Sequence, residues 1–264
     1  MALAEFDLTG GRVLITGAGR GIGKGIALAM ADAGADVDVG VTSLGEASAA
    51  QVAAEVRARG RAGYGWAADG TSEASMTALL PKVMAEMGGV DVLINCLGDS
   101  ISGAVAQAPG ATGPVMTPTD WHHVIDINLT QAYLACHIFG PSMLERGEGC
   151  VINISSFAAL KGAPNQSAYA AAKTGLTRFT ESLALEWAPY GLRVNGIAPG
   201  TFPDREAMDD ETWERRQAQA QTAIPLRRLG LVREVGLLAV YLASEAAAYI
   251  TGQTIAIDGG RTIL

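Results

Sequence analysis

The chain has 264 residues, of which 49% are apolar, 33 are glycine and only 17% are charged. This composition supplies enough apolar side chains for a sizeable core and excludes an intrinsically disordered chain. The formal net charge of −8 argues against nucleic acid or an anionic membrane surface as the main partner.

Cysteines and apolar runs narrow the class of protein further. Cys96, Cys136 and Cys150 are too few and too scattered for a disulfide framework or a zinc site. No apolar run has the length of a membrane span, and the N-terminal region lacks the basic stretch of a secretory signal. We therefore expect a globular cytoplasmic protein that holds no metal.

Short apolar runs alternate with longer amphipathic stretches along the whole chain. Several of the runs are continuously apolar, which is typical of strands that helices cover on both faces. Strands are expected at residues 12–16, 36–41, 62–67, 90–95, 150–155, 193–198 and 254–257. Helices are expected at residues 20–33, 46–59, 72–87, 119–146, 166–188 and 231–243. The alternation predicts an α/β protein with a doubly wound parallel sheet, Rossmann-like, as one domain over residues 1–264.

Two longer segments interrupt this alternation. Residues 98–118 are rich in Gly, Ala and Pro, while residues 200–225 are polar and partly helical. Each follows an expected strand at its carboxyl end, where open α/β sheets bind their ligands. We expect a substrate wall and a lid there, with the acidic run at 209–211 starting a lid helix.

A glycine-rich turn follows the first expected strand and leads into the first helix. Gly17, Gly21 and Gly23 allow a sharp turn and a close backbone approach to a ligand. The helix that follows presents free N–H groups and the positive end of its dipole to an anion. In this position after a first strand, the turn predicts a site for a dinucleotide pyrophosphate.

The end of the second expected strand favours NADP(H) over NAD(H). An acidic residue at this position would bind the ribose hydroxyl of NAD, but here Val41 is followed by Thr42 and Ser43. Arg20, in the glycine-rich turn, can reach a 2′-phosphate. Asp38, within the strand, has no role that the sequence explains.

Tyr169 and Lys173 form the expected catalytic pair. Residues four apart lie on one face of a helix, so the ammonium is expected near the phenol. A nearby cation lowers the pKa of a tyrosine, which brings it closer to that of a general acid or base. The preceding strand ends in Ser155 and Ser156, and only one of these hydroxyls is expected to reach a substrate carbonyl.

In this order and spacing the motifs resemble the short-chain dehydrogenase/reductase family over essentially the whole chain, and most closely its 3-oxoacyl reductases. The matching residues are Thr16, Gly17, Gly21, Gly23, Asp69, Asn95, Asn128, Ser156, Tyr169, Lys173, Pro199, Gly200 and the ending Asp258-Gly-Gly260. The resemblance implies a doubly wound fold, a homotetramer or homodimer, and hydride transfer between a nicotinamide and a ketone or secondary alcohol.

The resemblance also implies roles for individual residues. Tyr169 would transfer the proton, Ser156 would position the carbonyl, Lys173 would hold the ribose and Asn128 would keep a water-linked proton path open. Asp69 would contact the adenine, Asn95 would lie beside the adenosine, and the turn at 199–200 would face the nicotinamide carboxamide. The expected cofactor residues are Thr16, Gly17, Arg20, Gly21, Ile22, Gly23, Thr42, Ser43, Asp69, Gly70, Asn95, Gly98, Tyr169, Lys173, Pro199, Gly200 and Phe202.

The chain departs from the family pattern at two places. Leu97 replaces a small residue after the fourth expected strand, and Asp204 lies where a threonine is usual. Neither change removes a proton-transfer group. The acidic overall charge argues against an acyl-carrier protein as the partner, so a small ketone, an alcohol or an acyl thioester is expected as the substrate.

Three functions remain open at this point. The first is an NADPH-dependent carbonyl reductase, and the second is an NAD-dependent secondary-alcohol dehydrogenase. The third is a nucleotide-binding sensor or scaffold without turnover, which would not need a tuned phenol. The helices at 119–146 and 166–188 are expected to form a two-fold subunit interface, as the family does.

Overall fold

The computed structural model describes residues 3–42 and 46–264, with the backbone alone for residues 36–42. Seven parallel strands form one sheet in the order β3-β2-β1-β4-β5-β6-β7. They are β1 (Arg12–Thr16), β2 (Asp36–Thr42), β3 (Gly63–Ala68), β4 (Val92–Asn95), β5 (Gly149–Ile154), β6 (Leu192–Pro199) and β7 (Thr254–Ile257). The chain order reverses between β1 and β4, which creates a crevice at the carboxyl ends of these strands.

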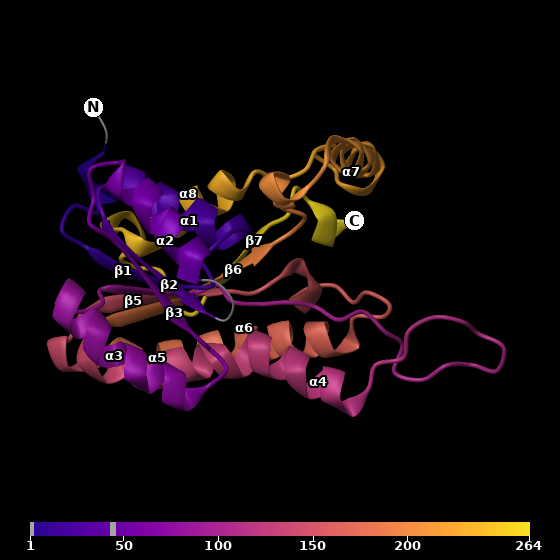
Figure 1. Cartoon of the computed structure of the whole chain (residues 1–264), viewed down its shortest axis with the longest axis horizontal. Coiled ribbons are helices and arrows are strands. Elements are labelled where there is room, and N and C mark those ends of the chain that lie inside the picture. Colours follow the sequence, from indigo (N-terminus) through magenta and orange to yellow (C-terminus); the bar gives the residue numbers. More distant parts are fainter. Residues whose placement is uncertain (1–2, 43–45) are drawn as a thin grey trace.

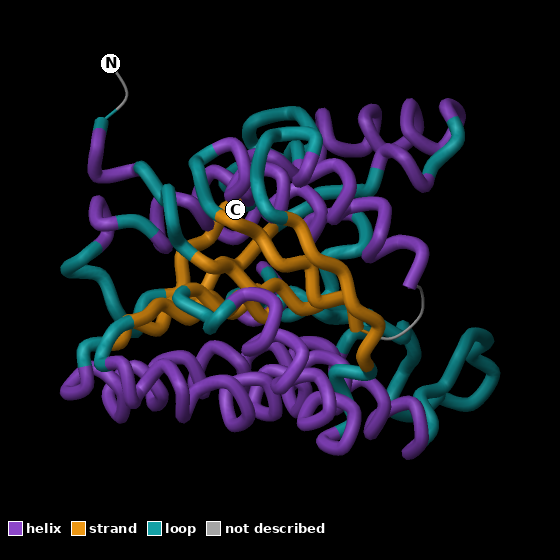
Figure 2. The backbone as a smooth tube through the Cα atoms, turned by 60° about the vertical axis from the view of Figure 1, so that its left-hand side comes forward, coloured by secondary structure: helices purple, strands orange, loops and turns teal. Residues whose placement is uncertain are grey.

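Helices cover both faces of this sheet (Figures 1 and 2). The first layer consists of α1 (Gly21–Asp32), α2 (Glu46–Arg57) and α8 (Val232–Ala243). The opposite layer consists of α3 (Glu73–Met87), α4 (Pro118–Ile125), α5 (Gln131–Arg146) and α6 (Ser167–Trp187). Each layer buries its own apolar cluster against the sheet. This architecture confirms the predicted doubly wound fold.

The predicted helix at 119–146 is interrupted in the structure. It begins one residue earlier, because Thr117 and Asp120 form a reciprocal capping box around Pro118. Between α4 and α5 the backbone then forms a five-residue π-helical segment, Asp126–Thr130. Such segments are frequent at functional sites and have no apolar periodicity that would reveal them in a sequence.

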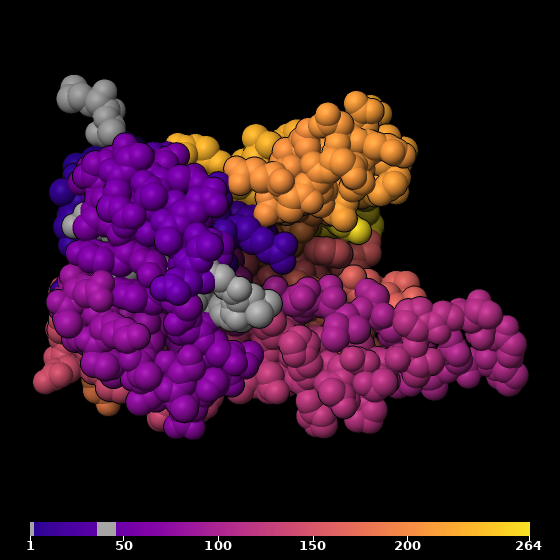
Figure 3. Space-filling view, viewed as in Figure 1, coloured from indigo at the N-terminus to yellow at the C-terminus, as the bar shows by residue number. Residues whose placement is uncertain are grey.

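The two irregular segments both follow the carboxyl ends of strands, β4 and β6. Residues 98–118 contain a single β-bridge, between Ala104 and Val115, and extend away from the body (Figure 1). The segment at 200–225 contains a short 3₁₀ turn and the helix α7 (Asp210–Ala223). Asp209 caps α7 by accepting a hydrogen bond of 2.7 Å from the Thr212 amide, as expected for the acidic run. In Figure 3 the two segments stand on either side of a hollow.

No helix among the residues described is both long and apolar enough to cross a bilayer.

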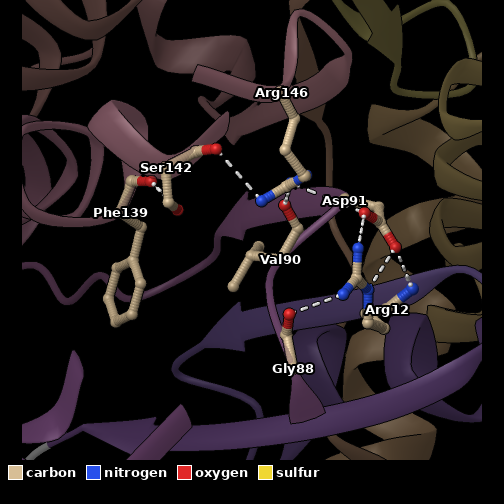
Figure 4. Close-up of polar contacts among 7 residues, drawn as sticks. All are labelled: Arg12, Gly88, Val90, Asp91, Phe139, Ser142 and Arg146. Atoms are coloured by element: carbon tan, nitrogen blue, oxygen red, sulfur yellow. Dashed lines mark hydrogen bonds and ion pairs between the residues drawn. The ribbon is translucent and has the colours of Figure 1, made fainter. Parts of the chain in front are cut away.

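A network of ion pairs joins the chain segments at the amino ends of the central strands (Figure 4). At the start of β1, the Nη2 and Nε atoms of Arg12 donate to the Asp91 carboxylate at 2.6 and 2.8 Å. Arg146, at the end of α5, donates to the carbonyl of Val90 and lies 3.5 Å from Asp91. Burial alone would raise the pKa of Asp91, but the hydrogen bonds from Arg12 outweigh it and hold this pKa below its ordinary value.

Replacing Asp91 should therefore destabilise the protein in a pH-dependent way. We expect Asp91→Asn to lower the free energy of unfolding at neutral pH by about 1–2 kcal/mol, since a half-buried charged acceptor is lost. The native pKa lies below the unfolded value of 3.8, so the contribution is present above pH 4 and disappears as the pH falls through the native pKa. Urea denaturation of both proteins between pH 3 and 7 measures this difference.

The matched control is Asp210→Asn, because Asp210 pairs with Arg205 at the surface with 85% of its side chain exposed. Exposed ion pairs contribute little, so this variant should be close to the wild type. A loss for Asp91→Asn that stays constant down to pH 3 would contradict the electrostatic explanation.

Candidate active site

A cavity of about 860 Å³ lies at the carboxyl ends of β1, β4, β5 and β6. Its walls come from the glycine-rich turn, the residues after β4, the end of β5, the first turns of α6 and the segment after β6. The volume is in the range of cavities that enclose cofactors and small ligands. The cavity thus occupies the crevice that the strand order predicts.

The glycine-rich turn leaves no space for a side chain at Gly17 or Gly23. Gly17 and Gly21 have φ angles of 73° and 55°, which favour glycine. A Cβ atom on Gly23 would lie 2.4 Å from the Gly17 carbonyl oxygen, and one on Gly17 would lie 2.7 Å from the Cα of Leu97. Helix α1 begins directly at Gly21, so its first amides adjoin the cavity. This cradle fits a pyrophosphate group bound by backbone N–H groups.

Arg20 lines the cavity and its side chain is exposed. It is the residue that the sequence assigns to a 2′-phosphate. The other half of that interpretation cannot be placed, because Ser43 and the side chains of Asp38 and Thr42 lie outside the described residues.

The predicted catalytic residues meet at the far end of the cavity. Tyr169 lies in the first turn of α6, and the Ser156 hydroxyl, which accepts from the Ala158 amide at 3.1 Å, lies near enough to its phenol to lower the phenol's pKa. The Nζ of Lys173 lies 5.7 Å from the centre of the phenol ring. The Ser155 hydroxyl instead bonds to the Lys173 carbonyl at 3.0 Å and to Thr177 at 3.1 Å. Of the two serines, it is therefore Ser156 whose hydroxyl reaches the phenol.

Lys173 is buried, with 3% of its surface exposed, although it carries an ammonium group. Its Nζ donates to the carbonyl oxygen of Ile154, the last residue of β5, at 2.9 Å. Burial lowers the pKa of Lys173 to about 8, and the thiol of Cys96 opposes this shift only in part. An ammonium has three donors, so N–H groups remain for a ligand in the cavity.

The pKa of Tyr169 departs from the sequence expectation. Burial raises it above the ordinary value of 10.0, the Ser156 hydrogen bond lowers it less, and the negative charge of Asp99 raises it further. The expected lowering by Lys173 was therefore wrong for the protein in this structure. The reason is that the phenol is removed from water, while the ammonium is itself desolvated and directed at Ile154. The phenol is consequently protonated at neutral pH.

Asn128 lies behind the cavity wall, within the π-helical segment. Its Nδ2 donates to the carbonyls of Asp99 at 2.6 Å and Val124 at 2.9 Å. Its buried Oδ1 accepts from no group among the described residues. A Cβ atom on Gly98 would lie 2.7 Å from this Oδ1 and 3.1 Å from the Lys173 Nζ, so both polar atoms adjoin the same glycine.

Asn95 and Thr16 have different roles from those expected. The Asn95 amide is fully buried and donates to Asn153 at 2.8 Å, and Asn153 donates to Thr180 of α6 at 2.9 Å. The Thr16 hydroxyl accepts from the Cys96 amide at 3.3 Å. Neither side chain reaches the cavity, which corrects the expectation that they contact a nucleotide. They hold β1, β4, β5 and α6 in register instead.

Asp69 and Gly70 also lie outside the described cavity lining. The exposed Asp69 carboxylate accepts hydrogen bonds from the amide of Thr71 at 2.9 Å and from its hydroxyl at 2.7 Å, which stabilises the turn before α3. The sequence-predicted cofactor residues that do line the cavity are Gly17, Arg20, Gly21, Ile22, Gly23, Gly98, Tyr169, Lys173, Pro199, Gly200 and Phe202.

The two departures from the family pattern both occur in the cavity wall. Leu97 is 8% exposed and packs its backbone against Gly17. The Asp204 carboxylate lies 3.8 Å from the position of a Cβ on Gly21, near the start of α1. Asp99, which also lines the cavity, was not predicted from the sequence. Its position directly after β4, at the carboxyl edge of the sheet, was the available signal.

No group of three or more potential metal ligands occurs within the described parts of the chain.

Comparisons with known proteins agree with this architecture. A family model described as enoyl-(acyl carrier protein) reductase matches residues 17–262. A 3-oxoacyl-[acyl-carrier-protein] reductase of Chlamydia muridarum is 35% identical over 185 residues, 70% of this chain and 71% of that protein. D-threitol dehydrogenase of Mycolicibacterium smegmatis is 36% identical over 219 residues, 83% of this chain and 79% of that protein.

A solved structure extends the similarity to the entire chain. It is a gluconate 5-dehydrogenase from Burkholderia cenocepacia in complex with NADP and tartrate, 32% identical, with a TM-score of 0.87 and coverage of 100% of both chains. Sequence motifs, fold and comparisons lead to one conclusion. The chain belongs to the short-chain dehydrogenase/reductase family and is an NAD(P)-dependent oxidoreductase.

Proposed function

We propose that this oxidoreductase is an NADPH-dependent reductase of small carbonyl compounds, with Tyr169 as the general acid. The observation that carries the proposal is the cluster of Ser156, Tyr169 and Lys173 in one cavity, with the phenol kept protonated by burial. The nicotinamide, when bound, supplies the hydride that adds to the carbonyl carbon. The residues of this chain supply the proton and the environment.

The proton transfer follows from the geometry. Ser156 and Tyr169 both line the cavity, so their hydroxyls are placed to donate to a carbonyl oxygen and polarise it. As negative charge develops on this oxygen, Tyr169 gives up its proton and the product is a secondary alcohol. The Lys173 Nζ lies 5.7 Å from the centre of the phenol ring, so its positive charge opposes the burial penalty on the phenolate left behind without outweighing it. The buried, unpartnered Oδ1 of Asn128, next to the same glycine as Lys173, is suited to accept from a water molecule that returns the proton.

The raised pKa of Tyr169 favours the reductive direction. A protonated phenol is ready to donate at neutral pH, whereas alcohol oxidation first requires a phenolate. An NAD-dependent secondary-alcohol dehydrogenase is therefore the second candidate. A nucleotide-binding sensor without turnover is less favoured, because binding alone does not require the ordered set of Ser156, Tyr169, Lys173 and Asn128.

The NADP(H) preference is part of the same proposal. Arg20 adjoins the glycine-rich turn with an exposed guanidinium, which is suited to bind a 2′-phosphate. The related gluconate 5-dehydrogenase was crystallised with NADP, which is consistent with this choice.

The family resemblance also suggests a subunit interface on α5 and α6. Exposed apolar or aromatic side chains of this region include Tyr133 on α5 and Leu185 on α6, which are 49% and 80% exposed. A homotetramer or homodimer built on these helices remains a prediction, which sedimentation of the purified protein would test.

The central test is Tyr169→Phe, which removes the proton donor and retains the ring. We expect the rate of ketone reduction to fall by about 10² or more, because general-acid help is lost. NADPH binding, followed by nucleotide fluorescence, should change little. Tyr249→Phe is the matched control, because this tyrosine is fully exposed and should retain the wild-type rate. A Tyr169→Phe variant with wild-type turnover would refute the proposed mechanism.

A second test concerns the space beside Lys173. In Gly98→Ala the new methyl group would overlap with the Asn128 Oδ1 and crowd the Lys173 Nζ, so one of them must shift. We expect the turnover rate to fall by about tenfold or more, since small displacements of catalytic groups are costly. Gly162→Ala is the control, because a Cβ there meets open space. Equal rates for the two variants would show that the packing at Gly98 is irrelevant to catalysis.

The nucleotide preference is tested with Arg20→Ala. Loss of the guanidinium should weaken NADPH binding about tenfold, because a charge-assisted contact to the phosphate disappears. NADH, which lacks the phosphate, should bind the variant and the wild type nearly equally and so provides the internal control. Tighter binding of NADH than of NADPH by the wild type would reject the NADP assignment.

A further inference from the structure

Four charged side chains line the described part of the cavity: Arg20, Asp99, Lys173 and Asp204. Arg20 and Asp204 adjoin the glycine-rich turn, at the phosphate end. Lys173 is buried at the base and bonded to Ile154. Asp99 is exposed and acts electrostatically on Tyr169, so it lies at the catalytic end. The catalytic end therefore presents one exposed charge to a substrate, and this charge is negative.

The position of Asp99 is fixed by two hydrogen bonds. Its carbonyl oxygen accepts from the Asn128 Nδ2 at 2.6 Å, which couples its backbone to a residue of the expected catalytic set. Its Oδ1 accepts from the following amide, that of Ser100, at 2.7 Å. The second carboxylate oxygen has no such partner within the described ranges. It is free to accept a hydrogen bond from a molecule in the cavity.

We propose that Asp99 determines substrate specificity by accepting a hydrogen bond from a hydroxyl group next to the reacting carbonyl and by repelling carboxylate or phosphate at that place. The substrate class is then a small neutral hydroxyketone, or the corresponding polyol in the reverse direction. This inference rests on the proposed function, since it assigns the substrate of the same site.

Charge and hydrogen-bonding capacity both support this assignment. A carboxylate can only accept hydrogen bonds, so it matches a hydroxyl donor and opposes an anion. The Lys173 ammonium is buried at the base of the cavity and already donates to Ile154, whereas Asp99 is exposed. Arg20 belongs to the glycine-rich turn, at the N-cap of α1. A substrate anion next to the carbonyl would therefore meet the exposed Asp99, and the buried Lys173 would offset this repulsion only in part.

The experiment compares two ketones that differ in one group. Dihydroxyacetone carries a neutral hydroxymethyl group where hydroxypyruvate carries a carboxylate. We expect the wild type to reduce dihydroxyacetone with the higher kcat/KM. In Asp99→Asn, which retains the oxygen that accepts from Ser100, the preference should shift toward hydroxypyruvate by about tenfold. In the wild type, discrimination against hydroxypyruvate should weaken at high salt, because ions screen the repulsion.

Asp204→Asn is the matched control, because it neutralises the other carboxylate of the lining, at the phosphate end. Its ratio of the two kcat/KM values should equal that of the wild type. A wild type that prefers hydroxypyruvate or reduces neither ketone overturns the inference, as does an unchanged ratio in Asp99→Asn. These results leave the proposed reductase intact if Tyr169→Phe still abolishes reduction of another ketone, whereas an active Tyr169→Phe variant refutes the proposed function itself.

Discussion

The ammonium of Lys173 occupies a position where a charge is costly. Its surroundings exclude water almost completely, and its partner from the chain is the neutral carbonyl of Ile154. The pKa falls from 10.5 to about 8, which corresponds to roughly 3 kcal/mol against the charged form. Buried charges with strongly shifted pKa values are concentrated at functional sites. A polar ligand that binds in the cavity can offset part of the desolvation cost. Much of the surrounding architecture serves to hold this one group in place.

Three elements cooperate in that task. β5 supplies the accepting carbonyl, and α6 supplies the side chain from the turn that follows Tyr169. The π-helical segment brings Asn128 to the other side of Gly98, where a side chain larger than hydrogen would displace the ammonium or the amide. Behind them, the Asn95–Asn153–Thr180 hydrogen bonds fix β4, β5 and α6 relative to one another. At the amino ends of the strands, the Arg12–Asp91 ion pair connects β1 with the segment that leads into β4.

The sequence predicts most of this arrangement because it depends on local patterns. Apolar runs and amphipathic stretches locate the seven strands and the helices of both layers, with differences of one or two residues at most ends. The glycine-rich turn and the Tyr169–Lys173 spacing identify the cavity, because each requires a particular residue type at a particular spacing. The π-helical segment was not predicted, since its hydrogen-bond shift leaves the helical pattern of side chains nearly continuous. Asn95 was misplaced for a related reason: its position at a strand end is local, but the direction of its amide depends on Asn153, far away in the sequence.

Electrostatic quantities were harder still to predict. The spacing of Tyr169 and Lys173 suggested a lowered pKa for the phenol, and burial reversed the sign. Burial depends on the packing of all surrounding elements, and no spacing between two residues encodes it.

The ion pairs of Lys24 in α1 could not be predicted from the sequence either, because they join residues far apart in the chain. The Lys24 Nζ lies 2.9 Å from Glu206 in the segment after β6 and 3.0 Å from Glu55 in α2. This contact links the segment that carries Asp204 to helices α1 and α2. The walls of the cavity near the glycine-rich turn are thus joined by charge pairs, whereas at the catalytic end Tyr169 and the buried Lys173 lie beside the exposed carboxylate of Asp99. In the proposed arrangement, nucleotide binding and substrate selection depend on different ends of one cavity, so replacing the single carboxylate of Asp99 is expected to change the substrate preference without altering the cofactor.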